Sequence, residues 1–303
     1  MDGGPPRWRE LAALARDAEG IGFDSLWVAD TILIRPEKAE AMGYWECWSL
    51  LAALAAITSR VELGSLVTGG SFRNPVLLAN LVNTVEEISA GRVILGIGAG
   101  EVGQYASLGL YAEGRYGRLE EVLAITRALL REGHAEFVGR HYEVRDAELP
   151  LRGPRATGPP ILLGTYPAPG PRMRRLAAQY ADGWNGWLAF DTSSPEAVRA
   201  ARIGLDQACR AIGRDPETLG RSVAVGVALP GRRLTFGPRD VGAGALTGSP
   251  EELAEKLRAF ASEGISHVQV YLGHTTVEDV ETFASVLDLL DSGPPTHAPS
   301  PTP

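Results

Sequence analysis

Short apolar runs alternate with amphipathic stretches along most of the chain. The runs are β-branched or end in glycine, and the stretches between them carry apolar residues at helical spacing. This alternation indicates repeated βα units. The predicted strands are Phe23–Ala29, Val61–Thr68, Arg92–Gly98, Pro160–Gly164, Gly183–Trp187, Ser222–Ala228 and His267–Leu272. The predicted helices are Arg7–Gly20, Glu46–Thr58, Pro75–Ser89, Arg118–Arg131, Pro171–Tyr180, Pro195–Ile212, Pro250–Glu263 and Val277–Leu290.

Strands that are apolar on both faces, such as VILGIG at residues 93–98, suit a parallel sheet covered by helices. The α/β architecture is then a barrel or a doubly wound sheet. The number of units in 303 residues, with no linker in mid-chain, favours a TIM-type (β/α)8 barrel. Two capping boxes mark helix starts, one from Ser249 to Glu252 and one from Thr275 to Glu278.

Two segments depart from this rhythm. Residues 133–149 alternate with period two about a turn at Gly139 and Arg140, which predicts an inserted β-hairpin. Residues 292–303 are rich in proline and have no apolar periodicity, so we expect a disordered tail. Residues 1–291 are expected to form one barrel domain.

Composition and charge exclude several classes of protein. The chain is 45% hydrophobic and 22% charged, which suits a globular protein. No apolar run is long enough for a membrane span, and the first residues do not resemble a signal peptide, so we expect a cytoplasmic protein. The net charge of -8 opposes nucleic acid and anionic membranes as partners. Two cysteines, Cys47 and Cys209, cannot form a disulfide framework or a cysteine metal site.

Specific stretches resemble the bacterial luciferase-like superfamily. They are GFDSLWVAD at 22–30, LAALAAITSRVELGSLVTG at 51–69, RNP at 73–75, SAGRVILGIGAG at 89–100 and AAQYADGWN at 177–185. The likeness runs from about Trp8 to Leu290. Members are flavin-dependent monooxygenases or deazaflavin-dependent oxidoreductases on a TIM-type barrel, and many are dimers. The resemblance therefore implies a planar tricyclic cofactor in the carboxyl-terminal mouth of the barrel, and a homodimer.

The resemblance and the local chemistry together assign the cofactor site. The family often has a non-proline cis peptide behind the ring, here at Leu66-Val67, although an ordinary strand end is the alternative. The glycines of GIGAG at 96–100 let the backbone approach the ring, or form only a tight turn. A glycine before a helix start favours a phosphate near Arg172, unless this arginine lies on a solvated face. Arg118 reaches the phosphate or pairs with Glu120 or Glu121. The expected cofactor-binding residues are Asp30, Leu66, Val67, Thr68, Gly98, Ala99, Gly100, Arg118, Thr165, Gly170 and Arg172.

Glu101, Thr31 and Tyr105 are the catalytic candidates. Glu101 stands where deazaflavin-dependent sugar-phosphate dehydrogenases hold an acid, although a solvated loop acid is the alternative. The family's usual Asp-His pair is Asp30-Thr31 here, and threonine does not titrate near neutral pH. Three possibilities follow: Glu101 carries the acid–base step, the substrate supplies it, or the activity differs from that of the histidine-bearing members. Tyr105 and Tyr111 are further donors.

Aromatic residues Trp45, Trp184 and Trp187 are the expected walls of a substrate pocket, whereas Trp48 suits helix packing. Capping explains Glu46 and Asn74 at least as well as catalysis does. The histidines lack metal-ligand spacing, so no metal site is predicted.

Three functions remain open. The first is hydride transfer between a small organic substrate and coenzyme F-420. The second is an FMN-dependent monooxygenase served by a separate flavin reductase. The third is a catalytically silent barrel that binds a cofactor or a partner.

Relatives begin with a strand before the first helix, whereas residues 1–6 are too short and too rich in glycine and proline to form one. We therefore expect seven strands and a gap between Phe23–Ala29 and His267–Leu272. The true start lies upstream, another segment or subunit fills the gap, or the barrel stays open.

Overall fold

Seven parallel strands form one curved sheet in the computed structural model, which describes residues 6–35, 40–190, 192–236, 239–273 and 276–292. Their order in the sheet is β1 (Ser25–Val28), β4 (Glu62–Ser65), β6 (Val93–Gly98), β9 (Ile161–Thr165), β10 (Gly183–Trp187), β11 (Gly220–Gly226) and β14 (His267–Tyr271). Each neighbouring pair is parallel. The predicted barrel of βα units is therefore confirmed.

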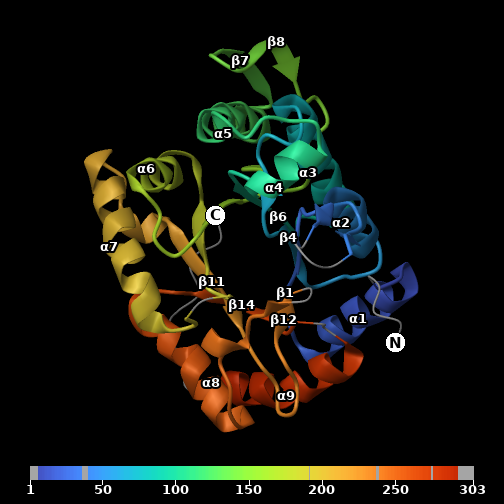
Figure 1. Ribbon diagram of the computed structural model, residues 1–303. Coiled ribbons are helices and arrows are strands. Elements are labelled where there is room, and N and C mark those ends of the chain that lie inside the picture. Colours follow the sequence, from blue (N-terminus) through green and yellow to red (C-terminus); the bar gives the residue numbers. More distant parts are fainter. Residues whose placement is uncertain (1–5, 36–39, 191, 237–238, 274–275, 293–303) are drawn as a thin grey trace.

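Helices surround this ring of strands (Figure 1). They bury apolar faces against the sheet, and together they form one continuous core. The helices that return between strands, with the opening and closing ones, are α1 (Trp8–Ile21), α2 (Cys47–Ala55), α3 (Pro75–Ile88), α5 (Arg115–Glu132), α6 (Pro171–Tyr180), α7 (Pro195–Ala211), α8 (Pro250–Ala259) and α9 (Val277–Ser292).

The strand predicted at Val61–Thr68 is interrupted. It consists of β4 and a two-residue strand β5 (Thr68–Gly69), which also pairs with β6. The peptide bond between Leu66 and Val67, which lies between the two strands, is cis, as predicted.

Strands β1 and β14 are the two ends of the sheet, and no backbone pairing joins them among the described residues. Side chains bridge them instead: the Ser25 hydroxyl lies 2.8 Å from Nε2 of His267, and the indole of Trp27 donates to Ser25 at 2.8 Å. Outside the sheet, α1 and α9 pack together, and Phe23 stacks on Phe283 with ring centroids 5.6 Å apart. The predicted gap is thus present, and helices cover its outer side.

Both predicted helix starts carry reciprocal capping bonds, but at the second helix the capping pair lies one residue later than predicted. Ser249 and Glu252 form the predicted box. Thr275 lies outside the described residues. Because α9 begins at Val277, Thr276 occupies the cap position, and it exchanges hydrogen bonds with Asp279.

The predicted insertion is a hairpin of β7 (His134–Val138) and β8 (Glu143–Glu148) that packs on α5. The Glu121 carboxylate fixes its turn by accepting from the amides of residues 140–142 at 2.8 to 2.9 Å. The predicted tail lies outside the described residues except for Ser292, which ends α9.

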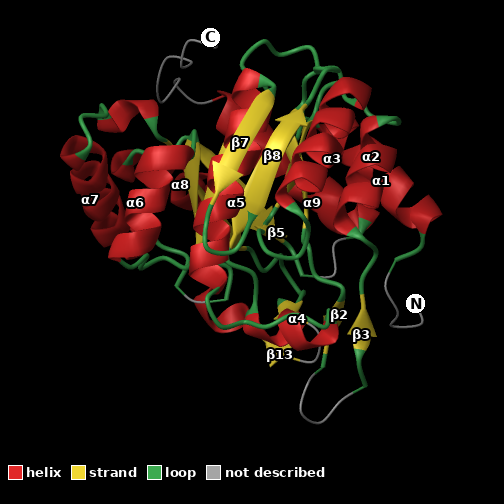
Figure 2. Cartoon of the chain, turned by 90° about the horizontal axis from the view of Figure 1, so that it is seen from above, coloured by secondary structure: helices red, strands yellow, loops and turns green. Residues whose placement is uncertain are grey.

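Several short elements were not predicted. They are α4 (Val102–Ser107), β2 (Leu33–Ile34), β3 (Met42–Gly43), β12 (Thr235–Phe236) and β13 (Arg239–Asp240). Figure 2 shows α4, β2, β3 and β13 together on one side of the barrel. Each follows the carboxyl end of a strand, so this side is the carboxyl-terminal rim.

The barrel interior contains a polar layer. The Asn185 amide donates to Ser222 at 2.9 Å and to Gln269 at 2.8 Å. Gln269, Ile94 and Leu162 line one cavity of about 180 Å³ from opposite sides of the ring, which shows that these side chains point inward.

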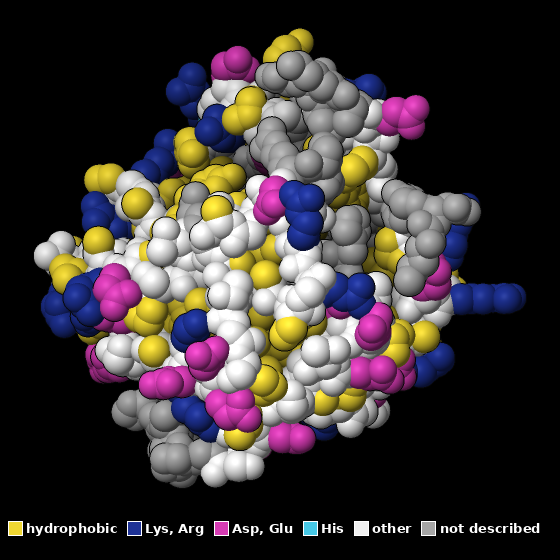
Figure 3. Space-filling model, turned by 60° about the horizontal axis from the view of Figure 1, so that its bottom comes forward, with side chains coloured by type: hydrophobic (Ala, Val, Ile, Leu, Met, Phe, Trp, Pro, Cys, Tyr) yellow, Lys and Arg dark blue, Asp and Glu magenta, His cyan; other side chains and the backbone are white. Residues whose placement is uncertain are grey.

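On the outer surface, acidic and basic side chains lie interspersed on the face seen in Figure 3. Among the described helices, none is long and apolar enough to cross a membrane. Both cysteines are free and buried.

Candidate active site

The candidate site lies at the rim formed by the carboxyl ends of the parallel strands. In such a barrel the loops after each strand converge on one mouth, where side chains from different strands meet. The loops after β1, β5, β6 and β9 form this rim. Of the predicted site residues, Asp30, Thr31, Ala99, Gly100, Glu101 and Gly170 lie in these loops, and Gly98, Thr165 and Trp187 are the last residues of β6, β9 and β10.

A buried ion pair joins the first two of these loops. Both terminal nitrogens of Arg73 bind the Asp30 carboxylate, at 2.6 and 2.9 Å, and the Gly69 amide donates to it at 3.1 Å. The Asp30 side chain is only 1% exposed. Asp30, predicted to bind cofactor, is therefore committed to holding the loops together, and its partner Arg73 was not predicted.

Glu46 extends this network and caps α2. Its carboxylate accepts from the amides of Trp48 and Ser49, and from Arg73 at 2.5 Å. Partial burial opposes ionisation, but the bonds from Ser49 and Arg73 outweigh it and lower the pKa of Glu46 to about 2. Glu46 is a capping residue, as Asn74 is at the start of α3.

Glycine backbone forms the floor of the mouth, and the side chain of Val67 packs against it. A Cβ placed on Gly98 would lie 2.8 Å from a methyl of Val67, and one on Gly164 would lie 2.4 Å from the other methyl. Only glycine leaves room for Val67 at these two positions. Thr68 is buried beside them and accepts a bond from the Trp48 indole at 3.2 Å, so Trp48 is a packing residue.

The loop after β6 carries Glu101 outward. Gly100 has a φ of 73°, and Glu101 follows as the residue before α4, with an exposed side chain. The Tyr105 hydroxyl donates to the Ala99 carbonyl at 2.6 Å, and its ring packs edge-on against Phe72. Tyr105 is buried, so it fixes this loop.

Thr31 is half-buried on the neighbouring loop. The side chain of Gln104, in α4, accepts bonds from the amides of Ile32 and Leu33 at 3.2 and 3.4 Å. This contact ties the loop that carries Thr31 to the loop that carries Glu101. Gln104 gave no sequence signal, because its partners lie about 70 residues away in the chain.

The expected phosphate site begins at Thr165. Its hydroxyl accepts from the Trp184 indole at 2.8 Å and donates to the Tyr166 carbonyl at 2.7 Å. Gly170 precedes α6, and a Cβ there would meet nothing within 4 Å. Arg172 is half-exposed and already paired with Glu120 at 2.8 Å. The helix start therefore offers open space and a cation that is partly neutralised.

Arg118 makes neither of the two predicted contacts with an acid. It donates to two backbone carbonyls of the loop that leads into α5, that of Tyr111 and, at 2.8 Å, that of Glu113. Glu120 is instead paired with Arg172 and Arg175. A hollow of about 400 Å³ opens beside these groups, lined by Glu113, Gly114, Gly117, Glu120, Glu121, Arg140, His141 and Arg172.

The three tryptophans predicted as pocket walls differ in their surroundings. Trp184 has no exposed surface, so it is a core residue that positions Thr165 and not a pocket wall. Trp45 is 48% exposed and donates to the Pro6 carbonyl at 2.8 Å. Trp187 ends β10 half-buried, beside Phe190 and Tyr271.

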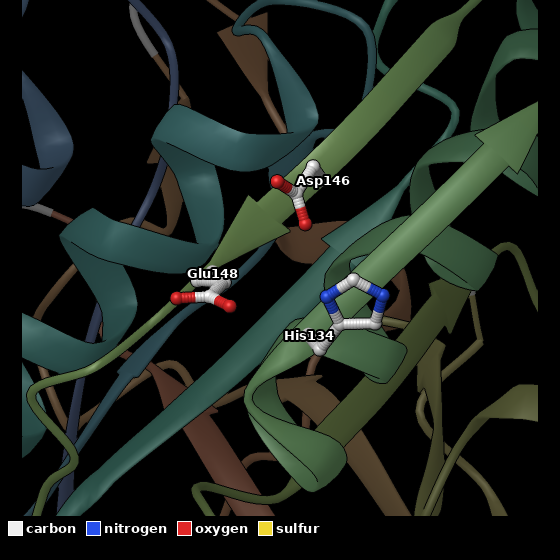
Figure 4. A group of neighbouring side chains, drawn as sticks. All are labelled: His134, Asp146 and Glu148. Atoms are coloured by element: carbon white, nitrogen blue, oxygen red, sulfur yellow. The ribbon is translucent and has the colours of Figure 1, made fainter.

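One histidine lies close to two carboxylates on the β7–β8 hairpin (Figure 4). Ligand atoms of His134, Asp146 and Glu148 lie within 4.8 Å of one another, and all three side chains are exposed. Strand pairing sets His134 opposite Glu148, which sequence spacing did not reveal. The group lies on the hairpin and not at the mouth.

The model of the family described as luciferase-like monooxygenase matches residues 1–233. The chain belongs to this family. Among the curated relatives, the F420-dependent glucose-6-phosphate dehydrogenase of Amycolatopsis mediterranei is 34% identical over 184 residues, 58% of this chain and 52% of the relative. The 5,10-methylenetetrahydromethanopterin reductase of Archaeoglobus fulgidus is 30% identical over 200 residues, 66% of this chain and 54% of the relative. The matches thus span only a little over half of these family members.

Solved structures of luciferase-like enzymes share the fold. An F420-dependent secondary alcohol dehydrogenase, in complex with an F420-acetone adduct, superposes with a TM-score of 0.77 at 19% identity and covers 94% of this chain and 96% of its own. The oxygenating constituent of a diketocamphane monooxygenase from Pseudomonas putida, in complex with FMN, gives 0.70 at 16% identity, with 96% and 94% covered. These likenesses support the luciferase-like barrel itself.

Proposed function

We propose that this protein is an oxidoreductase that uses the deazaflavin coenzyme F-420 to transfer hydride to or from a small organic substrate. The observation that carries the proposal is Glu101. Its carboxylate is exposed directly after the glycine floor of β6, and in the described part of the chain no side chain or amide binds it. Such a carboxylate is free to exchange a proton with a substrate. The name of the Amycolatopsis relative, an F420-dependent dehydrogenase, supports the choice of coenzyme.

The residues of the mouth fit a flat ring with a phosphate-bearing tail. Gly98 and Gly164 leave the floor without side chains except that of Val67. At the other end, the free amides at the start of α6 and the open space at Gly170 suit a phosphate. The ring would lie against Leu66, Val67, Thr68, Gly98, Ala99 and Gly100, and the phosphate against Thr165, Gly170 and Arg172.

When bound, the coenzyme supplies the two-electron chemistry, and the protein supplies orientation and proton transfer. Glu101 would accept the proton of a substrate hydroxyl during oxidation and return it to the oxygen during reduction. Thr31 does not titrate near neutral pH, so its role is limited to a hydrogen bond that orients the substrate oxygen. Tyr105 acts indirectly, because its hydroxyl holds the loop that carries Glu101.

Replacing Glu101 with glutamine tests this assignment. Turnover of secondary alcohols with oxidised coenzyme F-420, and of ketones with the reduced form, should fall by roughly 10²-fold or more, with little change in coenzyme affinity. Glu132→Gln, an exposed acid at the far end of α5, is the matched control and should behave like the unmodified protein. Equal turnover in Glu101→Gln would remove Glu101 from the reaction.

The alternative is an FMN-dependent monooxygenase that receives reduced FMN from a separate reductase, which the description of the matching family favours. Oxygen consumption with reduced FMN would distinguish it from the first proposal. A catalytically silent barrel would bind neither cofactor.

We also propose where the protein is located and how it assembles. Two buried, unpaired cysteines support a cytoplasmic location. Exposed Leu77 and Ile88, three turns apart on α3, support a homodimer, which sedimentation would test.

A further inference from the structure

Four aromatic rings form one cluster at the carboxyl ends of β10 and β14. Phe190 lies at its centre, with ring centroids 5.1 Å from Trp187, 4.7 Å from Phe236 and 5.7 Å from Tyr271. All four side chains are half-buried, so each keeps some exposed surface. Aromatic rings at these separations attract one another and hold a fixed arrangement. We call these four residues the aromatic wall.

The aromatic wall faces the interior of the barrel at the level of the mouth. Asn185 and Gln269 point inward, because both belong to the polar layer of the interior. Trp187 and Tyr271 follow them by two residues on the same strands, so their side chains lie on the same side of the sheet. They are also the last residues of β10 and β14, which places them at the rim.

The loop after β11 completes the wall and is fixed to it. Phe236 comes from β12 in this loop, and the Tyr271 hydroxyl donates to the neighbouring Thr235 carbonyl at 2.8 Å. Burial and the nearby Tyr44 raise the pKa of Tyr271 to about 12, so its hydroxyl stays neutral. With that hydroxyl bound to the backbone, the wall presents aromatic ring surface and no charged group of its own.

Arg232 and Arg233, the two arginines of this loop whose side chains the structure describes, are already paired. Arg232 binds Glu278 and lies 3.1 Å from Asp279, and Arg233 binds Asp240 at 2.6 Å. Neither is left free to bind a phosphate monoester at the wall. A charged substrate group placed there would lose water and gain no free cation from either of these two arginines, at a cost of several kcal/mol by order of magnitude.

We propose that the aromatic wall selects an uncharged alcohol or ketone that carries a flat apolar group, and that it excludes phosphorylated substrates. This inference rests on the proposed function in one point only, namely that the alcohol or ketone group of the substrate has to reach Glu101. The apolar group would pack on Trp187, Phe190 and Phe236. In this respect the protein differs from its relative named for glucose 6-phosphate.

Acetophenone and glucose 6-phosphate are the probes. Binding of each to the full-length protein is measured by calorimetry, without coenzyme and with it. Acetophenone should bind and glucose 6-phosphate should not. Trp187→Leu and Phe236→Leu should each weaken acetophenone binding roughly three- to tenfold, the loss expected when a ring contact is removed from an apolar pocket. Phe137→Leu on the outer hairpin is the matched control and should bind as the unmodified protein does.

Two results would overturn the proposal that the aromatic wall selects the substrate. One is binding of glucose 6-phosphate as tight as that of acetophenone. The other is unchanged acetophenone affinity in both wall variants, with folding verified by circular dichroism. Because these assays do not need turnover, a failure to bind coenzyme F-420 would count against the proposed function and would leave the test of the wall intact.

Discussion

Replacing Arg73 with methionine would leave the Asp30 carboxylate buried without its cation. In the native protein this carboxylate is held by both terminal nitrogens of Arg73 and by the Gly69 amide, and its side chain is 1% exposed. Methionine keeps most of the apolar stem of arginine, so the change removes mainly the charge and its hydrogen bonds.

The expected loss of stability follows from this burial. Removing one partner of a buried pair costs roughly 3–5 kcal/mol, since the remaining charge is uncompensated. Arg73 belongs in this range because its side chain is only 14% exposed and because it also binds Glu46. The Arg145–Glu143 pair is the matched control, with side chains 81% and 50% exposed. Arg145→Met should change the free energy of unfolding by no more than about 0.5 kcal/mol.

Urea denaturation followed by circular dichroism measures both changes, because urea is uncharged and does not screen ion pairs. The Asp30→Asn, Arg73→Met double variant should lose less than the sum of the two single variants, since the partners are coupled. A loss below about 1 kcal/mol for Arg73→Met would show that this pair stabilises the protein no more than a surface pair does.

Further predictions concern the floor, the gap and the hairpin. Gly164→Ala places a Cβ 2.4 Å from a methyl of Val67, so coenzyme binding, measured by fluorescence titration, should weaken at least tenfold, roughly the effect of overpacking. Gly103→Ala is the control, because its Cβ meets nothing within 4 Å, and this variant should bind the coenzyme normally. Burial lowers the pKa of His267, so the unfolded chain binds the proton first as the pH falls below about 6.5. Urea titrations should therefore show stability falling with acid in this window, with a shallower fall in His267→Asn; equal slopes would contradict this. Glu121→Ala should speed hydrogen exchange at the three amides of the hairpin turn, and unchanged exchange would show that the turn holds without it.

The order of strands and helices was predictable because burial follows the apolar pattern. All six residues of VILGIG are buried, and Gly183–Trp187 and Pro171–Tyr180 have the predicted bounds. The apolar pattern gave a wrong strand boundary where a polar residue is buried. Strand β11 begins at Gly220, two residues before the prediction, because Arg221 interrupts the apolar run although it lies buried with Asp206 at 2.5 Å.

The candidate site was predictable only in its position at the ends of strands. Loops that follow parallel strands meet at one rim, so Glu101, Thr31 and Thr165 could be placed there from the sequence. Their partners could not, because the contacts join residues far apart in the chain, as Arg73 does with Asp30. Phe190 and Phe236 gave no signal either, since a single aromatic residue in a loop has no periodicity.

We have proposed that the mouth of this barrel binds coenzyme F-420 and leaves Glu101 free for proton transfer. Titration of the purified protein with oxidised coenzyme F-420, followed by coenzyme fluorescence, tests it most directly. We expect saturable binding of equal affinity in the unmodified protein and in Glu101→Gln. Absence of binding, together with uptake and oxidation of reduced FMN with consumption of oxygen, would contradict it.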